Sequence, residues 1–384
     1  MLFLFFSFSI QAQTTQRRTI SGTIKDGKTG EELIGATVYV KDTAGIGTVT
    51  NGYGFFSLTL PANKNQIGIR YIGFDDYLVN LDTLTGTLLN VSLLPASKVL
   101  KEVEIKATKA NENITNAQMS AVKLDVKQLE KIPVLFGEKD ILKTIQLLPG
   151  VQPASEGNSG FYVRGSSNDQ NLILLDEAPV YNASHLLGFF SVFNNDAIKD
   201  ATLYKGNMPS EYGGRLASVL DIKMKEGNSK EYVIGGGIGL ISSRLNIEGP
   251  IVKDKGSFIV TGRRTYADLF LKLSKNENLR KSILYFYDIN AKANYRIGQR
   301  DRIFISGYFG QDRFGFQDRF SIVYGNATAT ARWNHLFSDK LFSNTSFIFN
   351  DFNYTVGINV ANIDVKSVIR DFSLKEDLDF YLNS

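Results

Sequence analysis

Residues whose types and spacing could support catalysis or metal binding are few in this sequence. The chain has no cysteine, which excludes disulfides, thiolate catalysis, iron–sulfur clusters, cysteine zinc sites and a lipoprotein anchor. Its two histidines, His185 and His335, lie far apart and lack the neighbours of an HExxH zinc motif. Ser184 directly precedes His185, but adjacency in sequence does not make a catalytic triad. We therefore expect no enzyme, no metal site and no cofactor.

A glycine-rich stretch, GGGIGL at residues 235–240, has some likeness to a dinucleotide-binding loop. Such a loop joins a strand to a helix, whereas this stretch is followed by more strand-like sequence and by Pro250. A glycine-rich strand that lies close against another domain explains the pattern better.

Charged residues occur instead at regular spacing on one face of long strand-like runs. The run at residues 287–297, YDINAKANYRI, alternates without an error. A dry core would require every charge on its polar side to be paired, so we expect that side to face water or a polar partner. The apolar side carries Tyr287, Ile289, Ala291, Ala293, Tyr295 and Ile297, and the polar side carries Asp288, Asn290, Lys292, Asn294 and Arg296.

The length of this run indicates what lies on its apolar side. Eleven residues at ~3.3 Å each, tilted by ~45°, cover ~25 Å, which is the height of the apolar band of an outer-membrane barrel. Tyr287 and Tyr295 lie near its two ends, where interfacial aromatic girdles occur. Residues 327–334 and 369–382 repeat the alternation, with Glu376 as an exception. The alternative is a large soluble antiparallel sheet with one face in water, because such a sheet alternates in the same way.

Composition narrows the class further. The 34 glycines, 17 tyrosines and 27 phenylalanines, against eight prolines, favour strands and turns. The net charge is +4 with both signs interspersed, so we expect no nucleic-acid partner. The apolar run at residues 1–12, MLFLFFSFSIQA, is interpreted as a signal peptide that is too short to span a bilayer. It lacks the usual positive n-region, so either the true start lies upstream or the signal is a poor one; a buried N-terminal strand is the alternative.

The first large region, residues 17–96, has short alternating runs separated by Gly, Asn, Asp and Pro, which is typical of a small β-sandwich. Asn51 and Gly52 are placed in a turn before a strand. This region resembles the carboxypeptidase regulatory-like domain, a prealbumin-like sandwich without catalytic residues. The resemblance rests on ISGTIKD, GEELIGATVYVKDT, GTVTNGYGFFSLTLP and IGIRYIGFDDY.

The middle of the chain has a different composition. Residues 97–110 are a charged linker, and residues 111–228 combine one helix with short strands, which indicates a compact α+β unit. The predicted helix lies in EKDILKTIQLLPG and is ended by Pro149 and Gly150. Its apolar face carries Ile141, Leu142, Ile145 and Leu148.

Here the sequence resembles the TonB-dependent outer-membrane receptors in which a regulatory-like sandwich precedes a plug domain. The resemblance rests on LKEVEIKA, ILKTIQLLPGVQPASEGNSGFYVRGSSNDQNLILLDEAPVYN, DAIKDATLYKGNMPSEYGGRLASVLDIKMKEG, LNIEGPI and GSFIVTGRRTYADL. It implies a mainly β protein: a prealbumin/Ig-like β-sandwich, then an α+β plug domain, then a partial antiparallel transmembrane β-barrel of about seven strands at residues 229–384. Plugged barrels have ~22 strands, so we expect the chain to be a piece of a longer protein.

The resemblance also implies which plug residues contact the barrel. In the family, plug arginines pair with acidic residues on the inner barrel wall, so we expect Arg164, Lys205 and Arg215 to hold the plug, although each could equally be an exposed charge. Asp176 lies in a loop where Asp-Gly is commoner, and Glu177 departs from that pattern. The candidate plug residues are Arg164, Gly165, Asp176, Lys205, Gly206, Tyr212, Gly213 and Arg215.

A second candidate site lies in the linker. An alternating hexapeptide in a polar segment can leave its own domain and add to the sheet edge of a partner, as the TonB box of this family does. The alternative is that it is only the first plug strand or part of the linker. The hexapeptide is Glu102, Val103, Glu104, Ile105, Lys106 and Ala107.

The function that the resemblance implies is active uptake of a scarce ligand through a plugged barrel. The implied place is the outer membrane of a Gram-negative bacterium, with the plug and N-terminal domain on the periplasmic side. The implied partners are TonB, outer-membrane lipid, an unknown small ligand and a surface lipoprotein. The glycan-importing branch usually carries a segment like KDASATAIYGSRAANG where this chain has KDATLYKGNMPSEYGGRLA, so a siderophore, metal chelate or vitamin is favoured. The alternatives are an oligosaccharide importer, a non-transporting surface adhesin or binding module, and a secreted metallocarboxypeptidase.

Overall fold

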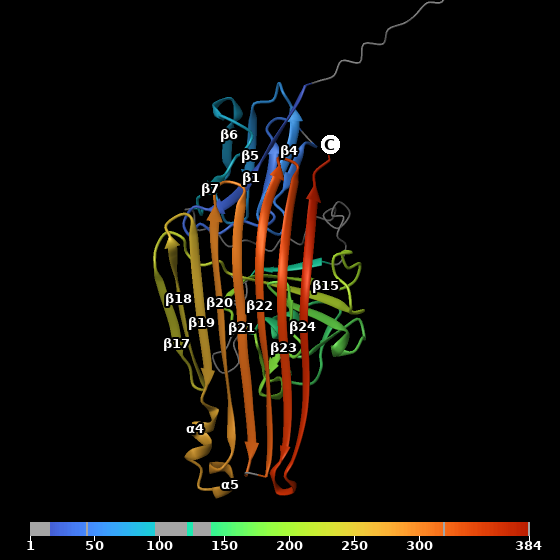
Figure 1. The fold of residues 1–384 in the computed structure, drawn as a ribbon, viewed down its shortest axis with the longest axis vertical. Helices are drawn as coiled ribbons and strands as arrows, with labels where there is room; N and C mark the ends of the chain where they lie inside the picture. Colours follow the sequence, from blue (N-terminus) through green and yellow to red (C-terminus); the bar gives the residue numbers. More distant parts are fainter. Residues whose placement is uncertain (1–15, 44, 97–120, 126–139, 318, 383–384) are drawn as a thin grey trace, which may run out of the picture. The chain divides into compact units, whose positions relative to one another are not determined.

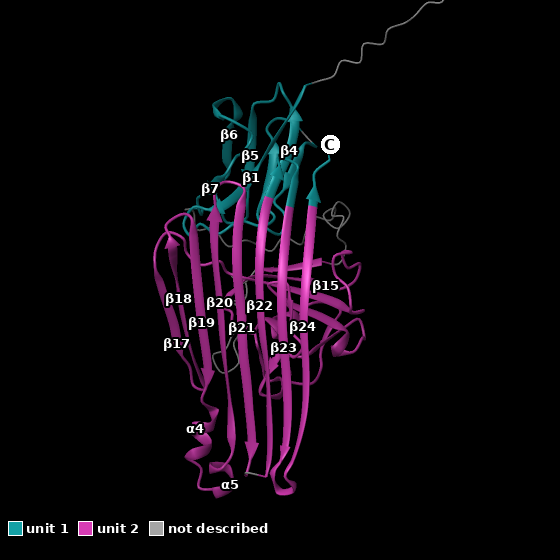
Figure 2. Cartoon of the chain, viewed as in Figure 1, with its two compact units in different colours: residues 1–99, 336–342, 379–384 teal, residues 100–335, 343–378 magenta. Residues whose placement is uncertain are grey.

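The structure, a computed structural model, describes residues 16–43, 45–96, 121–125, 140–317 and 319–382 (Figure 1). The chain divides into two compact units (Figure 2). The first unit consists of residues 1–99, 336–342 and 379–384, and the second of residues 100–335 and 343–378.

The N-terminal region forms the predicted β-sandwich. One sheet has the order β4-β1-β7 and the other β3-β2-β5-β6, and apolar side chains of both enter one core. In the turn before β4, the Asn51 side-chain oxygen accepts hydrogen bonds from the backbone N–H groups of Tyr53 and Phe55. The elements are β1 (Arg17–Asp26), β2 (Thr37–Val40), β3 (Gly47–Val49), β4 (Phe55–Pro61), β5 (Gln66–Arg70), β6 (Tyr77–Asn80), η1 (Leu81–Thr83) and β7 (Val91–Leu93).

The plug region of the second unit is built on a five-stranded sheet of order β12-β11-β16-β15-β8, in which only the β11–β16 pair is parallel. Its strands are β8 (Ala121–Asp125), β11 (Asn171–Leu175), β12 (Ala178–Pro179), β15 (Ile198–Tyr204) and β16 (Ser218–Met224). Smaller elements are β9 (Val151–Pro153), β10 (Phe161–Val163), η2 (Asn168–Gln170), β13 (Ser184–His185), η3 (Leu186–Gly188) and β14 (Phe190–Ser191).

The predicted helix of the plug region is present as α3 (Ile141–Ile145) and is shorter than its apolar pattern suggests. The Asp140 side chain caps its start by accepting hydrogen bonds from the N–H groups of Leu142 and Lys143. Ile141, Leu142 and Ile145 enter the plug core, so the helix is positioned by its apolar face.

The C-terminal part of the second unit is an eight-stranded meander in which each strand pairs with the next along the chain. Its strands are β17 (Val233–Ile238), β18 (Ser242–Val252), β19 (Gly256–Thr265), β20 (Ile283–Ile297), β21 (Asp301–Phe316), β22 (Phe320–Ser338), β23 (Leu341–Ile358) and β24 (Ile363–Phe380). The helical turns α4 (Ala267–Lys272), α5 (Glu277–Arg280) and η4 (Asn359–Ala361) lie in its connections.

The meander differs in detail from the expected partial barrel of about seven strands. The pattern of residues 232–249 predicts one unbroken strand, but these residues form two, because the chain reverses after β17 where the Gly239 N–H donates to the Ser242 carbonyl. The pattern of residues 256–272 also predicts one strand, but residues 267–272 form the helix α4. The structure therefore describes eight strands in this sheet.

The two faces of β20 confirm the alternation predicted from its sequence. Asp288 and Lys292 are 0% and 4% exposed, whereas Ile289 between them is 49% exposed. A soluble sheet with one face in water buries its apolar side, and this strand does the reverse. A polar inner face and an apolar outer face are the arrangement of a membrane barrel wall, so the predicted mainly β fold class is confirmed. Among the described residues, no helix is long and apolar enough to cross a membrane.

Candidate functional site

Three cations converge on the inner face of the meander. Lys292 of β20, Arg302 of β21 and Arg332 of β22 surround the ring of Phe304, at 5.8, 4.6 and 4.1 Å from its centroid. All four side chains are buried. Phe304 is paired with Arg332 and with Asn294 across the sheet, so the strand register brings these charges together. We call Lys292, Arg302 and Arg332 the cationic wall.

The first anion that meets the cationic wall is Asp176, in the turn between β11 and β12. Its Oδ2 atom lies 2.9 Å from Nζ of Lys292, and both side chains are buried. Its Oδ1 atom accepts a hydrogen bond of 2.9 Å from the N–H of Met224, and its carbonyl accepts one of 3.0 Å from Thr330 Oγ1. Lys292 also donates to the Met224 carbonyl at 3.0 Å. One lysine thus binds two neighbouring plug strands.

Glu177, the next residue, is the second anion. Its Oε1 atom lies 3.6 Å from a terminal nitrogen of Arg332 and accepts a hydrogen bond of 3.4 Å from Asn344. Glu177 has a φ of 74° and Asp176 one of 45°, a left-handed conformation that glycine adopts without strain and other residues do not. The carboxylate of Glu177 is therefore held at the wall at the expense of backbone strain.

Glu226, just after β16, is the third anion. Its Oε2 atom lies 2.8 Å from Arg302, and Lys199 of β15 lies 3.8 Å from its Oε1 atom. Its carbonyl accepts hydrogen bonds from Ser257 and Asn294 of the wall. Because Glu226 lies where the plug region leads into the meander, this contact fixes the connection as well as the plug.

The electrostatics of these carboxylates follow from burial opposed by cations. Burial alone would raise the pKa of Asp176, Glu177 and Glu226, yet nearby lysine and arginine side chains hold each pKa below its ordinary value. Lys292 is the largest cationic influence on Asp176, and Arg302 is the largest on Glu226. All three acids are therefore ionised at neutral pH, and the interface consists of buried ion pairs rather than neutral hydrogen bonds.

The basic plug residues that were expected to hold the plug make other contacts. Lys205 donates to the Pro149 carbonyl at 2.9 Å, a contact inside the plug region. Arg164 is exposed, and its guanidinium packs at Gly206, where an added Cβ would lie 2.6 Å from it. At the cationic wall, three acidic plug residues meet cations, whereas the resemblance implied plug arginines paired with acidic residues of the barrel.

The other candidate plug residues have varied positions. Asp176 is the one that reaches the cationic wall. Tyr212 donates from its hydroxyl to Asp221 at 3.1 Å within the plug region. Gly165 has a φ of 80°, so its turn requires glycine. Gly213 lies in the loop before Arg215, where an added Cβ would meet open space. The hexapeptide at residues 102–107 and the signal peptide at 1–12 lie outside the described residues.

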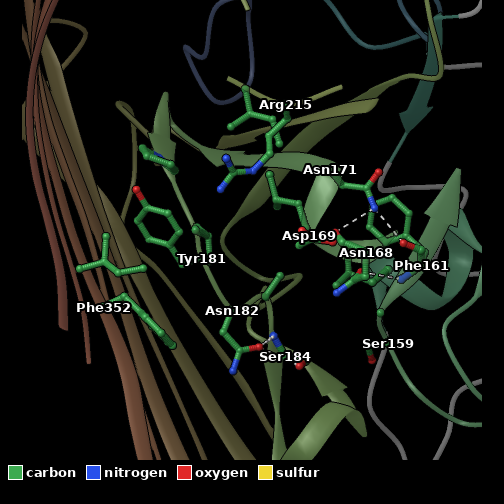
Figure 3. Close-up of a pocket in the computed structure, with 18 residues that line it drawn as sticks. Ser159, Phe161, Asn168, Asp169, Asn171, Tyr181, Asn182, Ser184, Arg215 and Phe352 are labelled. Carbon is green, nitrogen blue, oxygen red and sulfur yellow. Dashed lines mark hydrogen bonds between the residues drawn. The ribbon is translucent and has the colours of Figure 1, made fainter. Parts of the chain in front are cut away.

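Arg215 lines a cavity of about 290 Å³ between the plug region and strands β23 and β24 (Figure 3). Its guanidinium extends toward the space that Tyr181 enters from another loop (Figure 3). Amide side chains of Asn168 and Asn182 and the ring of Phe352 complete a lining of mixed polarity. This cavity combines one cation, Arg215, and one carboxylate, Asp169, with aromatic and amide groups, which suits a small polar ligand. Among the described residues, no group of three or more histidines or acids could hold a metal ion.

Comparison with known families assigns two regions of the chain. Residues 20–105 match the CarboxypepD_reg-like domain, and residues 114–219 match the TonB-dependent receptor plug domain. The second match contains Asp176, Glu177 and the cavity residues of the plug region. No curated protein matches the chain.

Solved structures that resemble this chain include receptors for siderophores. A mutant of the ferric enterobactin receptor PfeA from Pseudomonas aeruginosa is 14% identical, with a TM-score of 0.52, over 70% of this chain and 47% of that one. Another mutant of that receptor, in complex with enterobactin, is 14% identical with a TM-score of 0.50, over 69% and 47% of the two chains. The siderophore receptor PirA from Acinetobacter baumannii is 16% identical with a TM-score of 0.48, over 68% and 45%. The chain thus spans about half the length of these structures.

Proposed function

We propose that this chain, which belongs to the TonB-dependent receptors, forms the plugged part of an outer-membrane importer for a scarce ligand, energised by TonB. Its domains are a signal peptide at 1–12, the sandwich at 17–96, a linker with the TonB box at 97–110, the plug at 111–228 and barrel strands at 229–384. The plug and sandwich face the periplasm, and the hexapeptide from Glu102 to Ala107 is the segment that TonB takes up by strand addition.

The observation that carries this proposal is the set of buried ion pairs between plug and wall. Removing one partner of a buried pair costs about 3–5 kcal/mol, because the other charge stays buried without compensation. A plug held by Asp176, Glu177 and Glu226 against the cationic wall therefore does not leave the lumen by thermal motion at a useful rate. Work supplied from outside the receptor is needed, and a pulled TonB box supplies it.

For the ligand, we propose an iron chelate of the siderophore class rather than a metal-free vitamin or a glycan. The cavity beside Arg215 and Tyr181 offers a guanidinium, one carboxylate (Asp169), aromatic rings and amides. The guanidinium and the aromatic and amide groups can bind an anionic chelate with aromatic or amide arms. The PfeA structures, which share the fold, are of a ferric enterobactin receptor. Both considerations favour a ferric catecholate as the first ligand to test.

The test is uptake by cells that produce the receptor, with radiolabelled iron delivered as ferric enterobactin. We expect accumulation that stops when the membrane potential is collapsed or when TonB is deleted. Cyanocobalamin and a maltooligosaccharide serve as competing ligands of other classes. Energy-dependent uptake of the oligosaccharide alone would move the receptor to the glycan-importing branch. Surface binding of a ligand with no uptake would instead favour an adhesin or binding module.

A further inference from the structure

One plug side chain meets the wall with the opposite polarity from the three acids. His185 of β13 is buried between two wall carboxylates, with its Nδ1 atom 2.5 Å from Asp312 Oδ2 and its Nε2 atom 3.3 Å from Asp288 Oδ2. Its ring stacks on Phe286 at 4.0 Å with 5° between the planes. This contact lies apart from the cationic wall, although Asp288 and Lys292 belong to the same strand.

The geometry suits a charged imidazole. A neutral imidazole has one N–H and can donate to only one acceptor, whereas an imidazolium donates from both nitrogens. The two nitrogens of His185 face two carboxylates, which are acceptors when ionised. A neutral ring could donate to Asp312 and accept from the Tyr308 hydroxyl, 3.5 Å from Nε2, but it would give no proton to Asp288.

The backbone that follows His185 is strained. Leu186 and Leu187 have φ values of 48° and 58°, so two consecutive residues with bulky side chains are left-handed. Their N–H groups are held by the wall: Leu186 donates to Asp312 Oδ1 at 2.7 Å, and Leu187 donates to the Tyr324 hydroxyl at 2.9 Å. Asp312 thus binds both the ring of His185 and the strained backbone next to it, and the two contacts depend on each other.

We propose that His185 is a charge-dependent latch that holds the plug loop of residues 184–191 in a strained conformation against the barrel wall and releases it when the imidazole loses its proton. The inference rests on the proposed function only in assigning the loop to a plug that moves. It predicts regulation of that movement by pH, separately from the acids at the cationic wall.

The charges around the latch support this assignment. Asp312 and Tyr308 face His185 from β21, Asp288 from β20, Arg263 from β19 and Tyr324 from β22. Arg263 lies 2.7 Å from Asp288 and donates to the Ser191 carbonyl at the other end of the loop. Two carboxylates with one guanidinium leave one negative charge, which a protonated His185 neutralises.

The direction of the pH dependence follows from the same contacts. Burial alone would lower the pKa of His185, but Asp312 and Asp288 together raise it above the ordinary value of ~6.5. A group with a raised pKa in the folded state contributes stability fully below its unfolded pKa and loses it as the pH rises through the folded value. The latch is therefore closed below the ordinary histidine pKa and opens as the pH rises through the raised pKa of His185.

The experiment measures hydrogen exchange of the full chain in detergent, as the protection factor of a peptide covering residues 184–191. Protection factors are ratios to the intrinsic rate, so the pH dependence of exchange itself cancels. At pH 6 we expect at least a tenfold loss of protection in His185→Gln, whereas the parent keeps its protection at pH 6 and loses it as the pH is raised. In Asp312→Asn the loss should occur at lower pH than in the parent. Equal protection of parent and His185→Gln at pH 6 would overturn the proposal.

His335 provides a matched control, because it is the other histidine of the chain and its Nδ1 atom lies 2.7 Å from Asp301 within the wall. His335→Gln should leave the protection of residues 184–191 unchanged. A peptide covering residues 171–180 reports whether the plug remains folded in each variant. With only two histidines in the chain, nitrogen resonances of labelled histidine also show directly whether His185 is an imidazolium at pH 6, and a neutral tautomer at that pH refutes the latch. Neither readout depends on transport, so failure of ligand uptake would leave this test intact.

Discussion

Replacing Lys292 with methionine tests the ion pair that holds the plug at the β11–β12 turn. Methionine keeps most of the apolar volume and removes the ammonium group, so the Asp176 carboxylate stays buried without its principal cation. Such a loss costs about 3–5 kcal/mol. At pH 7, protonation of the Asp176 carboxyl limits this cost to about 4 kcal/mol. The ordinary aspartate pKa of ~3.9 lies ~3 units below pH 7, and each unit corresponds to about 1.4 kcal/mol.

The chain has no cysteine, so a single reporter thiol can be introduced without background. Ser306 suits this purpose, because it is a small residue buried on the inner face of β21. In a Ser306→Cys background, labelling of the thiol measures how often the plug leaves the wall. We expect Lys292→Met to raise the labelling rate by a hundredfold to a thousandfold at pH 7, since about 1.4 kcal/mol is a factor of ten. The ratio to the parent should fall about tenfold per pH unit on acidification, because protonation of Asp176 becomes cheaper.

Two further variants make the result specific. Lys366→Met removes an exposed lysine of β24 and should not change the labelling rate. The double variant Lys292→Met with Asp176→Asn should label more slowly than Lys292→Met alone, because the uncompensated charge is gone. A labelling rate within threefold of the parent in Lys292→Met, or no recovery in the double variant, would refute the conclusion that this pair holds the plug.

Four other expectations follow. Glu177→Gly relieves the backbone strain of a positive φ but removes the carboxylate that contacts Arg332. Plug retention should therefore weaken by about 1–2 kcal/mol, which would appear as roughly tenfold faster thiol labelling in the Ser306→Cys background. The pKa values of Asp176, Glu177 and Glu226 are lowered in the folded state, so these acids stabilise the seated plug above the unfolded pKa of ~4. That stabilisation is lost as the pH falls through the folded pKa values, so pepsin should cleave the plug only below about pH 4. Tyr212→Phe removes a hydrogen bond to Asp221 and should lower plug stability by about 0.5–1.5 kcal/mol in denaturant without faster labelling at the wall. Arg215→Ala should weaken binding of ferric enterobactin at least tenfold by titration while leaving the labelling rate unchanged; equal affinity would remove the cavity from the ligand site.

The faces of the barrel strands could be predicted from sequence because side chains alternate with a fixed period of two. Once YDINAKANYRI was assigned as strand, Asp288 and Lys292 had to share a face, and the structure buries both. The division of residues 232–249 into two strands could not be predicted in the same way. The reversal near Gly239 has no proline and no Asn-Gly pair, so the pattern contained no turn signal strong enough to separate the strands.

The partners of the charged residues were less predictable than their faces. Lys292, Arg302 and Arg332 converge from three strands, and which plug residue meets them depends on the register of all three together. One signal was nevertheless present in the sequence. Glu177 occupies a turn position where glycine is common in the family, and an acidic residue in a strained left-handed conformation is retained only when its side chain has a strong contact. The presence of glutamate rather than glycine at position 177 therefore indicates the contact between Glu177 and Arg332.

The distribution of charge along one strand has a mechanical consequence. Asp288 holds the plug through a cation, His185, and Lys292 holds it through an anion, Asp176, four residues apart on the same inner face of β20. Acidification weakens the second contact and a rise in pH weakens the first, so no single change in pH releases both. A plug retained by two contacts of opposite pH dependence stays seated across the range in which both are charged. Within that range only a mechanical pull, or a ligand that binds the two states differently, can unseat it.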